Sequence, residues 1–555
     1  MNRATVDGPP LMARGYIRSS AVTTGCPQLN FLSTDHETTL GAQPTARQRG
    51  HMGYARVRAL GLVGLEGHPV TVEAHVDAGL PALVLSGLPD ASLNEARDRV
   101  RAAIVNSDEK WPQRRITVNL LPAELPKRGS GFDLAIALVV LTGIGTLPRN
   151  GLGGAALIGE LGLDGQVRSV RGILPMALAA AKAGIGRLIV PAANASEAGL
   201  VPGVTVRGAE TLRQVIEFVR AAIPLLTPPT VDESSEDTGP DLADVLGQER
   251  GRFALELAAA GRHHLAMFGS PGAGKTMLAQ RLPSILPPLD DAAALAVTAV
   301  HSIAGTLPPV ARLIRRPPFQ APHHTASAAA LVGGGTGLAR PGALSLAHEG
   351  VLFLDEAPHF RTDVLNALRQ PLEEGWVTLA RAQGSTRYPA QIQLVLAANP
   401  CPCGLGKDAS CTCSPLARRT YLHRLSGPLM DRIDVRVTLE PVGAAALFDT
   451  TGATESSSQV LKRVIQAREA AQARWTGQGF TVNARASGTV LRCLPFRLPH
   501  KATAGLAKLL DCGSLSARGY DRVLRVAWTI VDLEGRSTPD ADDINEALQL
   551  RLGTS

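Results

Sequence analysis

The feature that most constrains this chain is an eight-residue segment at positions 269–276 with the pattern Gly-x-x-x-x-Gly-Lys-Thr. An apolar run at 265–268, expected to be a strand, leads into it, and residues 277–282 have a helical pattern. Glycines at such a turn let backbone N–H groups point at phosphate oxygens, while Lys275 reaches the terminal phosphates and Thr276 binds Mg²⁺. A plain glycine-rich turn is the alternative, and the full pattern in this context disfavours it. The predicted ATP-binding residues are Gly269, Ser270, Pro271, Gly272, Ala273, Gly274, Lys275 and Thr276.

Two acidic residues and an asparagine follow further apolar runs that have the pattern of buried strands. Residues 351–354 lead into Asp355 and Glu356, where the first acid would hold Mg²⁺ and the second would polarise a water molecule. A strand expected at 392–398 leads into Asn399, whose amide would position the attacking water as the sensor 1 residue of AAA+ proteins does. Surface acids and a loop asparagine are the alternatives, and the position downstream of a P-loop favours the catalytic interpretation.

Two arginines complete the predicted site for ATP hydrolysis. Arg432, in the segment 426–434, is a candidate arginine finger, a cation that stabilises transition-state charge across a subunit boundary. The active unit would then be a ring. Arg518 lies at the head of a helix expected at 516–533 and is the sensor 2 candidate, with a surface salt bridge as its alternative.

The predicted fold class is α/β, in several parts. Residues 1–51 look like a disordered leader, and Met52 is a candidate for the true start. An α/β domain is expected at 52–222, with a strand at 115–121, helices at 132–141 and 172–183, and a hairpin turn at Asp164-Gly165 in which both residues have positive φ. An acidic linker rich in Pro and Ser at 223–240 leads to an ATPase core at 241–445 and a helical lid at 446–555, whose last helix begins at the cap 538–540.

Composition limits the class of protein further. The chain has 555 residues and 45% hydrophobic content, enough for several domains, and no apolar run has the length of a membrane span. The first residues do not resemble a secretory signal, so a cytoplasmic location is expected. The net charge of +7 favours a polyanionic partner, although many basic proteins have none.

Four of the seven cysteines crowd into positions 401–413 as two Cys-x-Cys pairs. Such a cluster suits a metal site or reduced thiols better than the disulfide framework of a secreted protein. Four thiolates would bind structural Zn²⁺, but the spacing is tighter than the usual zinc knuckle, so both alternatives stay open. The four residues are Cys401, Cys403, Cys411 and Cys413.

From residue 52 to its C-terminus the chain resembles the competence protein ComM (YifB) family of magnesium-chelatase-like AAA+ ATPases. The segments that carry the resemblance are Ala-Pro-His-His-Thr-Ala-Ser at 321–327, the glycines at 333–335, Arg-Pro-Gly at 340–342, Leu-Arg-Gln-Pro-Leu-Glu at 368–373, Asn-Pro-Cys-Pro-Cys-Gly at 399–404 and residues 426–434. The resemblance implies a homo-hexameric ring motor that moves branched DNA during natural transformation, a branch migration helicase. It also implies that 446–555 is the C-terminal domain of magnesium chelatases.

In this superfamily two segments typically project into the central pore. They correspond here to the insert at 320–344 and the hairpin at 378–388. Arg381 and Arg387 on that hairpin are the candidate DNA contacts, with a solvated hairpin face as the alternative. For His323 and His324 a loop-packing or pore role is expected rather than metal binding, because no Cys, Asp or Glu lies close by in the sequence.

Residues 124–190 resemble the proteolytic domain of Lon-type proteases, which use a serine nucleophile and a lysine. Aligning the glycines puts Gly131 at the nucleophile position and Leu174 at the lysine position, so the predicted domain is non-proteolytic. A displaced dyad of Ser130 with one of two lysines is the alternative. Those lysines are Lys127 and Lys182.

Three other functions compete with a DNA motor. A magnesium-chelatase motor subunit would not ordinarily carry the Lon-like domain, and an ATP-dependent protease would need the missing dyad. A non-enzymatic nucleotide-binding scaffold would have no use for Glu356 and Arg432. One departure from the family is Trp528, which stands where a basic residue is expected and puts in doubt whether the lid helix makes every usual polar contact.

Overall fold

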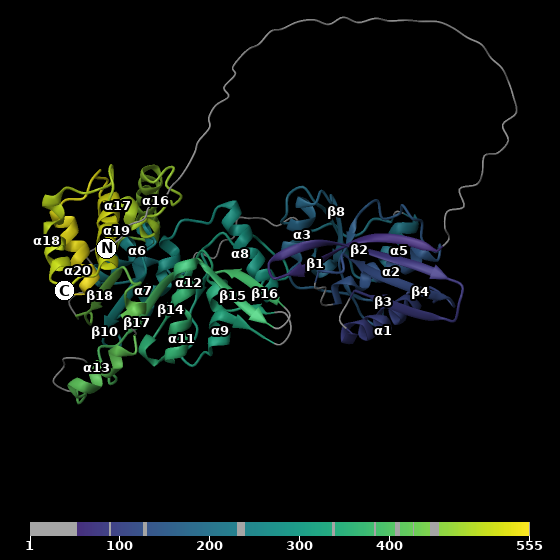
Figure 1. Ribbon diagram of the computed structural model, residues 1–555, viewed down its shortest axis with the longest axis horizontal. Coiled ribbons are helices and arrows are strands. Elements are labelled where there is room, and N and C mark those ends of the chain that lie inside the picture. The colour runs from purple at the N-terminus through teal and green to yellow at the C-terminus, as the bar shows by residue number, and fades with distance from the viewer. Residues whose placement is uncertain are drawn as a thin grey trace, which may run out of the picture. The chain divides into compact units, whose positions relative to one another are not determined.

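The structure is a computed structural model, shown in Figure 1, and it is a mixed α/β protein. It describes residues 53–87, 90–125, 130–221, 223–229, 239–335, 339–381, 384–405, 411–425, 427–443 and 454–553. The predicted leader at 1–51, residues 230–238 of the predicted linker and Lys127 lie outside the described residues.

A seven-stranded mixed sheet forms the first part of the chain, in the order β3-β4-β2-β1-β5-β8-β9. Its strands are β1 (Tyr54–Val63), β2 (Glu66–Asp77), β3 (Ala82–Ser86), β4 (Arg115–Leu121), β5 (Ala156–Leu157), β8 (Arg187–Pro191) and β9 (Thr205–Ala209). β2 pairs antiparallel with both β1 and β4, whereas β3–β4, β1–β5, β5–β8 and β8–β9 are parallel pairs. The predicted strand at 115–121 is confirmed.

Apolar residues cover both faces of this sheet, because successive side chains of a strand point to opposite sides. Ile189 belongs to one apolar cluster with helix α2, while its neighbours Leu188 and Val190 belong to another with helix α3. All eleven residues of α2 are buried, as its uniformly apolar sequence requires. The helices of this part are α1 (Asp90–Asn106), α2 (Asp133–Gly143), α3 (Ile173–Lys182), α4 (Ala195–Ala198) and α5 (Leu212–Ala221).

The predicted hairpin at Asp164-Gly165 is present, but the prediction of its turn was wrong. Strands β6 (Glu160–Leu161) and β7 (Val167–Arg168) pair antiparallel around it. Gly165 has a φ of +83°, whereas Asp164 is not among the described residues with positive φ. The Asp164 carboxylate instead accepts a hydrogen bond of 3.1 Å from the backbone N–H of Gln166, which stabilises the turn without a left-handed aspartate.

A five-stranded sheet forms the second part, in the order β11-β14-β17-β10-β18, and all its pairs are parallel. Its strands are β10 (Leu265–Gly269), β11 (Phe319–Gln320), β14 (Val351–Leu354), β17 (Gln393–Ala398) and β18 (Val435–Leu439). Every residue of β14 and β17 is buried, which explains their continuous apolar sequences. This arrangement confirms the predicted strands before the acidic pair and before Asn399.

Helices and short hairpins surround this sheet. The helices are α6 (Glu249–Gly261), α7 (Lys275–Arg281), α8 (Asp291–Ala304), α9 (Ala328–Val332), α10 (Ala343–Leu346), α11 (Thr362–Ala367), α12 (Arg369–Glu374), α13 (Pro415–His423) and α14 (Gly427–Met430). The two-stranded sheets are β12 (Gly333–Gly334) with β13 (Arg340–Pro341) and β15 (Trp376–Arg381) with β16 (Gly384–Pro389). Within the described residues, α8 packs on α3, and the backbone N–H of Gly172 donates to the carbonyl of Ser302 at 3.3 Å.

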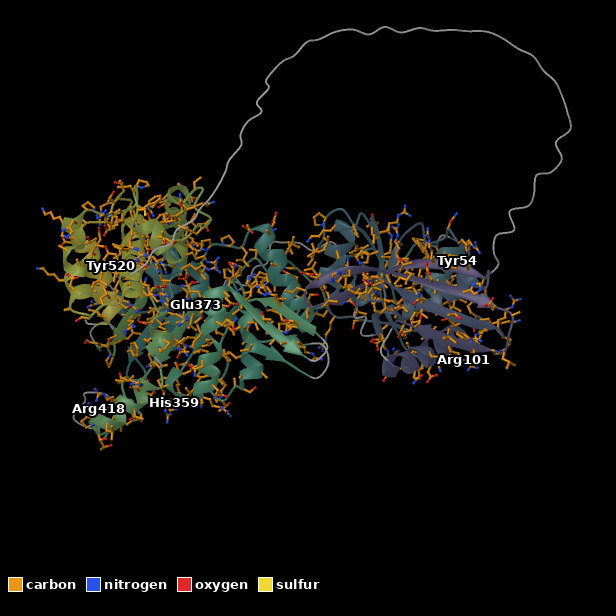
Figure 2. The ribbon with its side chains drawn as sticks, in the orientation of Figure 1. Tyr54, Arg101, His359, Glu373, Arg418 and Tyr520 are labelled. Carbon is orange, nitrogen blue, oxygen red and sulfur yellow. The ribbon has the colours of Figure 1, made fainter. Side chains whose placement is uncertain are left out.

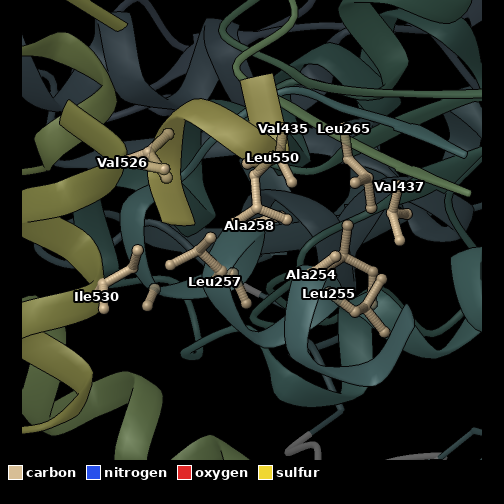
Figure 3. Packing of buried hydrophobic residues seen from close by; sticks show 14 of the residues in the cluster. Ala254, Leu255, Leu257, Ala258, Leu265, Val435, Val437, Val526, Ile530 and Leu550 are labelled. Atoms are coloured by element: carbon tan, nitrogen blue, oxygen red, sulfur yellow. The ribbon is translucent and has the colours of Figure 1, made fainter. Parts of the chain in front are cut away.

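The C-terminal region is helical, as predicted, and is drawn in yellow-green to yellow in Figure 1. Its helices are α16 (Ser457–Arg474), α17 (Gly488–Leu491), α18 (His500–Asp511), α19 (Ala517–Leu533) and α20 (Ala541–Leu552). Side chains of α19 and α20 share one apolar cluster with α6, β10 and β18, as Figure 3 shows. Asp540 caps α20 through a capping box, as the predicted start of that helix requires.

Trp528 stands where the family pattern predicts a basic residue, and an arginine from another helix packs against its ring. The guanidinium of Arg474 on α16 lies 4.3 Å from the centre of the Trp528 ring. Arg474 Nη1 also donates to Asp532 on α19 at 3.0 Å. The lid helix therefore keeps an arginine contact, in which the cation stacks on an aromatic face.

Asp434 joins the lid helix to the parallel sheet. Its carboxylate is buried, pairs with Arg522 of α19 and lies 3.5 Å from Nδ1 of His263. The backbone N–H of His264 donates to it at 3.2 Å. Burial by itself would raise the pKa of Asp434, but the charge of Arg522 and the neighbouring His263 imidazole outweigh burial and hold this pKa well below its usual range.

Replacing Asp434 with Ala is expected to lower the free energy of unfolding by about 3 kcal/mol at neutral pH, because Arg522 loses its counter-charge in a buried site. Urea unfolding followed by tryptophan fluorescence measures this change. The depressed pKa means that the contribution is present above about pH 4, the ordinary pKa of aspartate, and is lost as the pH falls through the folded-state pKa. The gap between wild type and variant should therefore shrink below about pH 4.

Asp363→Ala provides the control for this prediction. Asp363 pairs with Arg361, and both side chains are mostly exposed to solvent. The urea midpoint of this variant should match that of the wild type. If Asp434→Ala matched the wild type as well, the buried ion pair would not be what stabilises the lid on the sheet.

Candidate nucleotide-binding site

The P-loop follows β10 and continues into α7, as the sequence predicts. Gly272 and Gly274 have φ of +79° and +83°, angles that glycine adopts without steric cost. The buried ammonium of Lys275 donates to the carbonyl oxygens of Gly269 at 2.8 Å and Ser270 at 2.9 Å. Burial lowers the pKa of Lys275, while the carboxylates of the acidic pair act in the opposite direction.

The acidic pair lies directly beside the P-loop. Thr276 Oγ1 donates to Asp355 Oδ2 at 2.6 Å, and the backbone N–H of Glu356 donates to Asp355 Oδ1 at 2.9 Å. A hydroxyl and a carboxylate at this distance are the hard oxygen ligands that Mg²⁺ prefers. Glu356 has a φ of +49°, an uncommon backbone conformation for a residue with a side chain.

Asn399 completes this group of residues. It follows β17, which lies between β10 and β14 in the sheet, so its side chain reaches the P-loop from the central strand. Asn399 Oδ1 accepts a hydrogen bond of 3.0 Å from Lys275 Nζ. The fold therefore brings together five predicted site residues, which are Lys275, Thr276, Asp355, Glu356 and Asn399.

The two predicted arginines lie together in a different place. Arg432 pairs with Glu373, and Arg518 Nη1 lies 3.9 Å from the same carboxylate, which Figure 2 labels. A cavity of about 180 Å³ opens beside them, and none of its lining residues belongs to the P-loop. Its lining residues are Glu373, Asp431, Arg432, Arg518, Asp521, Arg522 and Arg525. Arg432 and Arg518 thus form one cationic patch, which we call the Glu373 patch.

The four clustered cysteines converge, with ligand atoms within 4.8 Å of one another. The sulfur of Cys401 lies 3.2 Å from that of Cys403 and 3.6 Å from that of Cys411. Four thiolates around zinc at 2.3 Å would be about 3.8 Å apart, so a small adjustment fits this set to tetrahedral Zn²⁺. Cys411 also accepts a contact of 3.2 Å from Arg418 on α13, which Figure 2 labels.

This cysteine loop packs on the P-loop. Gly404 has a φ of +83°, and a Cβ atom added there would lie 2.6 Å from the Pro271 ring. The loop begins immediately after Asn399, so it adjoins the nucleotide site at two points.

The structure places beside Glu356 a residue that was not among the predicted residues of the nucleotide site. His324 Nδ1 lies 3.5 Å from Glu356 Oε2, a contact that the predicted loop-packing or pore role did not include. The relevant signal was the short strand β11, which pairs parallel with β14. Residues after parallel neighbouring strands emerge at the same sheet edge, so the segment after β11 and the acidic pair after β14 can meet there.

The predicted hairpin at 378–388 is formed by β15 and β16, in which Thr378 faces Arg387. Arg387 is exposed, and its guanidinium lies 5.1 Å from the centre of the Trp376 ring. Arg381 is the last residue of β15, opposite Gly384. The hairpin therefore presents one stacked arginine to solvent.

The two residues that stand at the dyad positions of Lon-type proteases, Gly131 and Leu174, lie in the part of the chain that contains the seven-stranded sheet. Leu174 is buried, and Gly131 lies in a short 3₁₀ turn before α2. The Ser130 hydroxyl donates to the Glu160 carboxylate, a partner that cannot act as the amine base of a Ser–Lys dyad. Nearby, burial raises the pKa of Asp133 to about 6, although its hydrogen bond with Arg99 lowers it.

The parallel sheet, the P-loop and the acidic pair define an AAA+ ATPase of the magnesium-chelatase type, and such a domain implies ATPase activity with ATP and Mg²⁺. The family model described as "Magnesium chelatase, subunit ChlI" matches residues 241–447. Two further models, "Subunit ChlI of Mg-chelatase" and "Magnesium chelatase, subunit ChlI C-terminal", match residues 72–194 and 454–551.

The chain belongs to the YifB/ComM family of magnesium-chelatase-like ATPases. It is 40% identical over 505 residues to competence protein ComM of Haemophilus influenzae, covering 90% of this chain and 98% of ComM. It is 39% identical over 500 residues to the uncharacterized protein YifB of Escherichia coli, covering 90% and 97% of the two chains. An uncharacterized protein of Mycobacterium tuberculosis, Rv2897c, is 50% identical over 500 residues, covering 90% and 99%. In the part of the chain that the structure describes, no helix combines the length and apolar character needed to span a bilayer.

Gly404→Ala is expected to weaken ATP binding at least about tenfold, because the added methyl group would push the cysteine loop against Pro271 and disturb the P-loop. Titration with a fluorescent ATP analogue measures the affinity. Gly477→Ala is the matched control, since Gly477 has a φ of +80° but nothing lies within 4 Å of an added Cβ. Equal affinity in the two variants would show that the contact between residue 404 and Pro271 does not influence ATP binding.

Proposed function

We propose that this protein is an ATP-driven motor that acts on DNA as a homo-hexameric ring and performs branch migration in recombination or natural transformation. One observation carries the ring part of this proposal. The chain holds a P-loop, an acidic pair and Asn399 in one place, while both candidate arginines lie with Glu373 in a cavity that includes no P-loop residue. A complete hydrolysis site then requires the Glu373 patch of a neighbouring copy.

The residues of one chain divide the work of hydrolysis. Lys275 and the backbone of residues 269–274 bind the phosphates of ATP, and Thr276 and Asp355 hold Mg²⁺, which neutralises charge on the β- and γ-phosphates when bound. Glu356 accepts a proton from the attacking water, and Asn399 orients that water beside the γ-phosphate.

Arg432 acts as the arginine finger of the neighbouring site, and Arg518 assists it as sensor 2. A fixed guanidinium stabilises the charge that spreads over the γ-phosphate oxygens in the transition state. In the isolated chain both arginines share the single carboxylate of Glu373. Assembly would exchange this carboxylate for the phosphates of the neighbour's nucleotide.

DNA is the proposed substrate of the motor. The net charge of +7 and the exposed Arg387 on the β15–β16 hairpin support contact with a phosphate backbone, and Arg381 lies on the same hairpin. The Haemophilus influenzae relative is named a competence protein, and this name supports a role in natural transformation. Such contacts read no sequence, so binding would be salt-dependent and sequence-independent.

The region at 52–222 is proposed to be a Lon-like domain without protease activity, joined by a linker at 223–240 to the ATPase core at 241–445 and the lid at 446–555. The Ser130–Glu160 hydrogen bond and the buried Leu174 support this proposal, because neither supplies an amine base. The domain then serves assembly or DNA engagement.

A second candidate function is that of a magnesium-chelatase motor subunit, which inserts magnesium into a porphyrin with a partner. The descriptions of the three matching family models favour it. Parallel assays with a Holliday junction, a porphyrin with Mg²⁺ and casein distinguish the motor, the chelatase and a protease.

Glu356→Gln is expected to bind ATP and assemble rings but to hydrolyse ATP at least about a hundredfold more slowly than the wild type, because the amide cannot accept the proton. Lys275→Ala should lose nucleotide binding. Phosphate release, binding of a fluorescent ATP analogue and negative-stain images with forked DNA measure these properties, and a Holliday junction reports branch migration. Equal turnover in Glu356→Gln and wild type, or a protein that stays monomeric and inert with DNA, contradicts the proposal.

The cysteine cluster is proposed to hold one structural Zn²⁺, supported by the convergence of the four sulfur atoms. When bound, the metal would cross-link the loop that follows Asn399 to the start of α13. This proposal replaces the alternative of four reduced thiols.

Purified protein is expected to contain about one zinc per chain by mass spectrometry of the metal, and Cys403→Ser to lose most of it, since removing one of four thiolates opens the site. Cys493→Ser is the control, because Cys493 is an exposed cysteine outside the cluster. A metal-free wild type whose clustered thiols all react with a thiol reagent would support the reduced-thiol alternative instead.

A further inference from the structure

His324 lies in the segment between β11 and α9 and reaches the candidate base of ATP hydrolysis. Its Nδ1 atom is 3.5 Å from Glu356 Oε2, with the two side chains 31% and 50% exposed. Both groups are thus partly shielded from water, although a ligand can still approach Glu356. Of the two adjacent histidines, only His324 has a described ion-pair contact with this carboxylate.

Tilted and edge-on ring contacts restrain the orientation of the His324 side chain. The His323 ring lies 4.1 Å from it, centre to centre, and the edge-on ring of His359 lies at 5.8 Å. His359 in turn meets the ring of Tyr421 at 5.5 Å, again edge-on. His359 also donates its backbone N–H to the carbonyl of Glu356 at 2.7 Å, so the same residue supports the base and its histidine neighbour.

Tyr421 links these rings to the other parts of the nucleotide site. It lies on α13, the helix that follows the cysteine cluster. Burial raises the pKa of the Tyr421 hydroxyl, the nearby charge of Glu356 raises it further, and the backbone of Asn399 lowers it. The rings therefore form a continuous contact from α13 to the carboxylate of Glu356.

Glu356 needs such a restraint because its own backbone is strained. With a φ of +49° it occupies a conformation that a non-glycine residue keeps only where its surroundings hold it. A carboxylate that accepts a proton from water must also present one oxygen to that water. A donor on the other oxygen fixes which oxygen remains free.

We propose that His324 is a positioning residue that holds Oε2 of Glu356 through Nδ1, so that the other carboxylate oxygen faces the water attacking ATP. The inference rests on the proposed role of Glu356 as the base. At 3.5 Å the contact is longer than an established hydrogen bond, and it shortens when nucleotide and water complete the site. His324 acts through Glu356 and touches neither ATP nor the water.

Three substitutions separate the hydrogen bond from the ring packing. His324→Ala removes both, His324→Phe keeps a ring without a donor, and His324→Asn keeps a donor near the Nδ1 position without the ring. Steady-state ATP hydrolysis gives kcat and KM, a fluorescent ATP analogue gives affinity, and thermal unfolding reports folding. His500→Ala is the matched control, since His500 is an exposed histidine on α18 that takes no part in these ring contacts.

The Ala and Phe variants are expected to lose kcat by at least about tenfold with KM and nucleotide affinity within twofold of the wild type. The Asn variant should keep kcat within about threefold, and His500→Ala should match the wild type. A Phe variant as active as the wild type, or an Asn variant as impaired as Ala, would overturn the inference, and so would loss of nucleotide binding. A wild type without ATPase activity would refute the proposed function and this inference together, whereas an active wild type with unaffected variants refutes this inference alone.

Discussion

The buried ammonium of Lys275 is the interaction on which the nucleotide site depends. A cation away from bulk water is stable only when hydrogen-bond acceptors surround it, and here Gly269, Ser270 and Asn399 supply three oxygens at 2.8–3.0 Å. These acceptors come from the loop itself and from the end of another strand. The Lys275 side chain therefore ties the P-loop to the central strand of the sheet before any phosphate is bound.

The strand order of the parallel sheet explains why the other site residues gather there. β17 lies between β14 and β10, so Asn399 comes between the acidic pair and the P-loop, and β11 brings His324 to the far side of Glu356. The cysteine loop continues from Asn399 and packs on Pro271. The phosphate-binding loop thus contacts both the acidic pair and the proposed zinc loop at one end of the sheet.

Arginine side chains make several of the polar contacts of the C-terminal helices. Arg522 pairs with the buried Asp434, and Arg474 stacks on Trp528 and bonds Asp532. Four arginines and three acids line the cavity at the Glu373 patch. Arg432 and Arg518 share the single negative charge of Glu373, so their charge is only partly neutralised. Cations held by a single shared carboxylate are suited to exchange that partner for phosphate, which is what a ring with shared sites requires.

Local sequence patterns were sufficient to predict those parts of the fold that depend on residues close together in the chain. The P-loop, the strands before Asp355 and Asn399, and the cap of α20 depend on neighbouring residues, so their patterns predicted them correctly. Which distant segments contact one another became visible only in the folded chain. His324 at Glu356, Arg474 on Trp528 and the sharing of Glu373 by two arginines join residues far apart in the chain. Such contacts follow from strand order and helix packing, which the periodicity of a single segment does not encode.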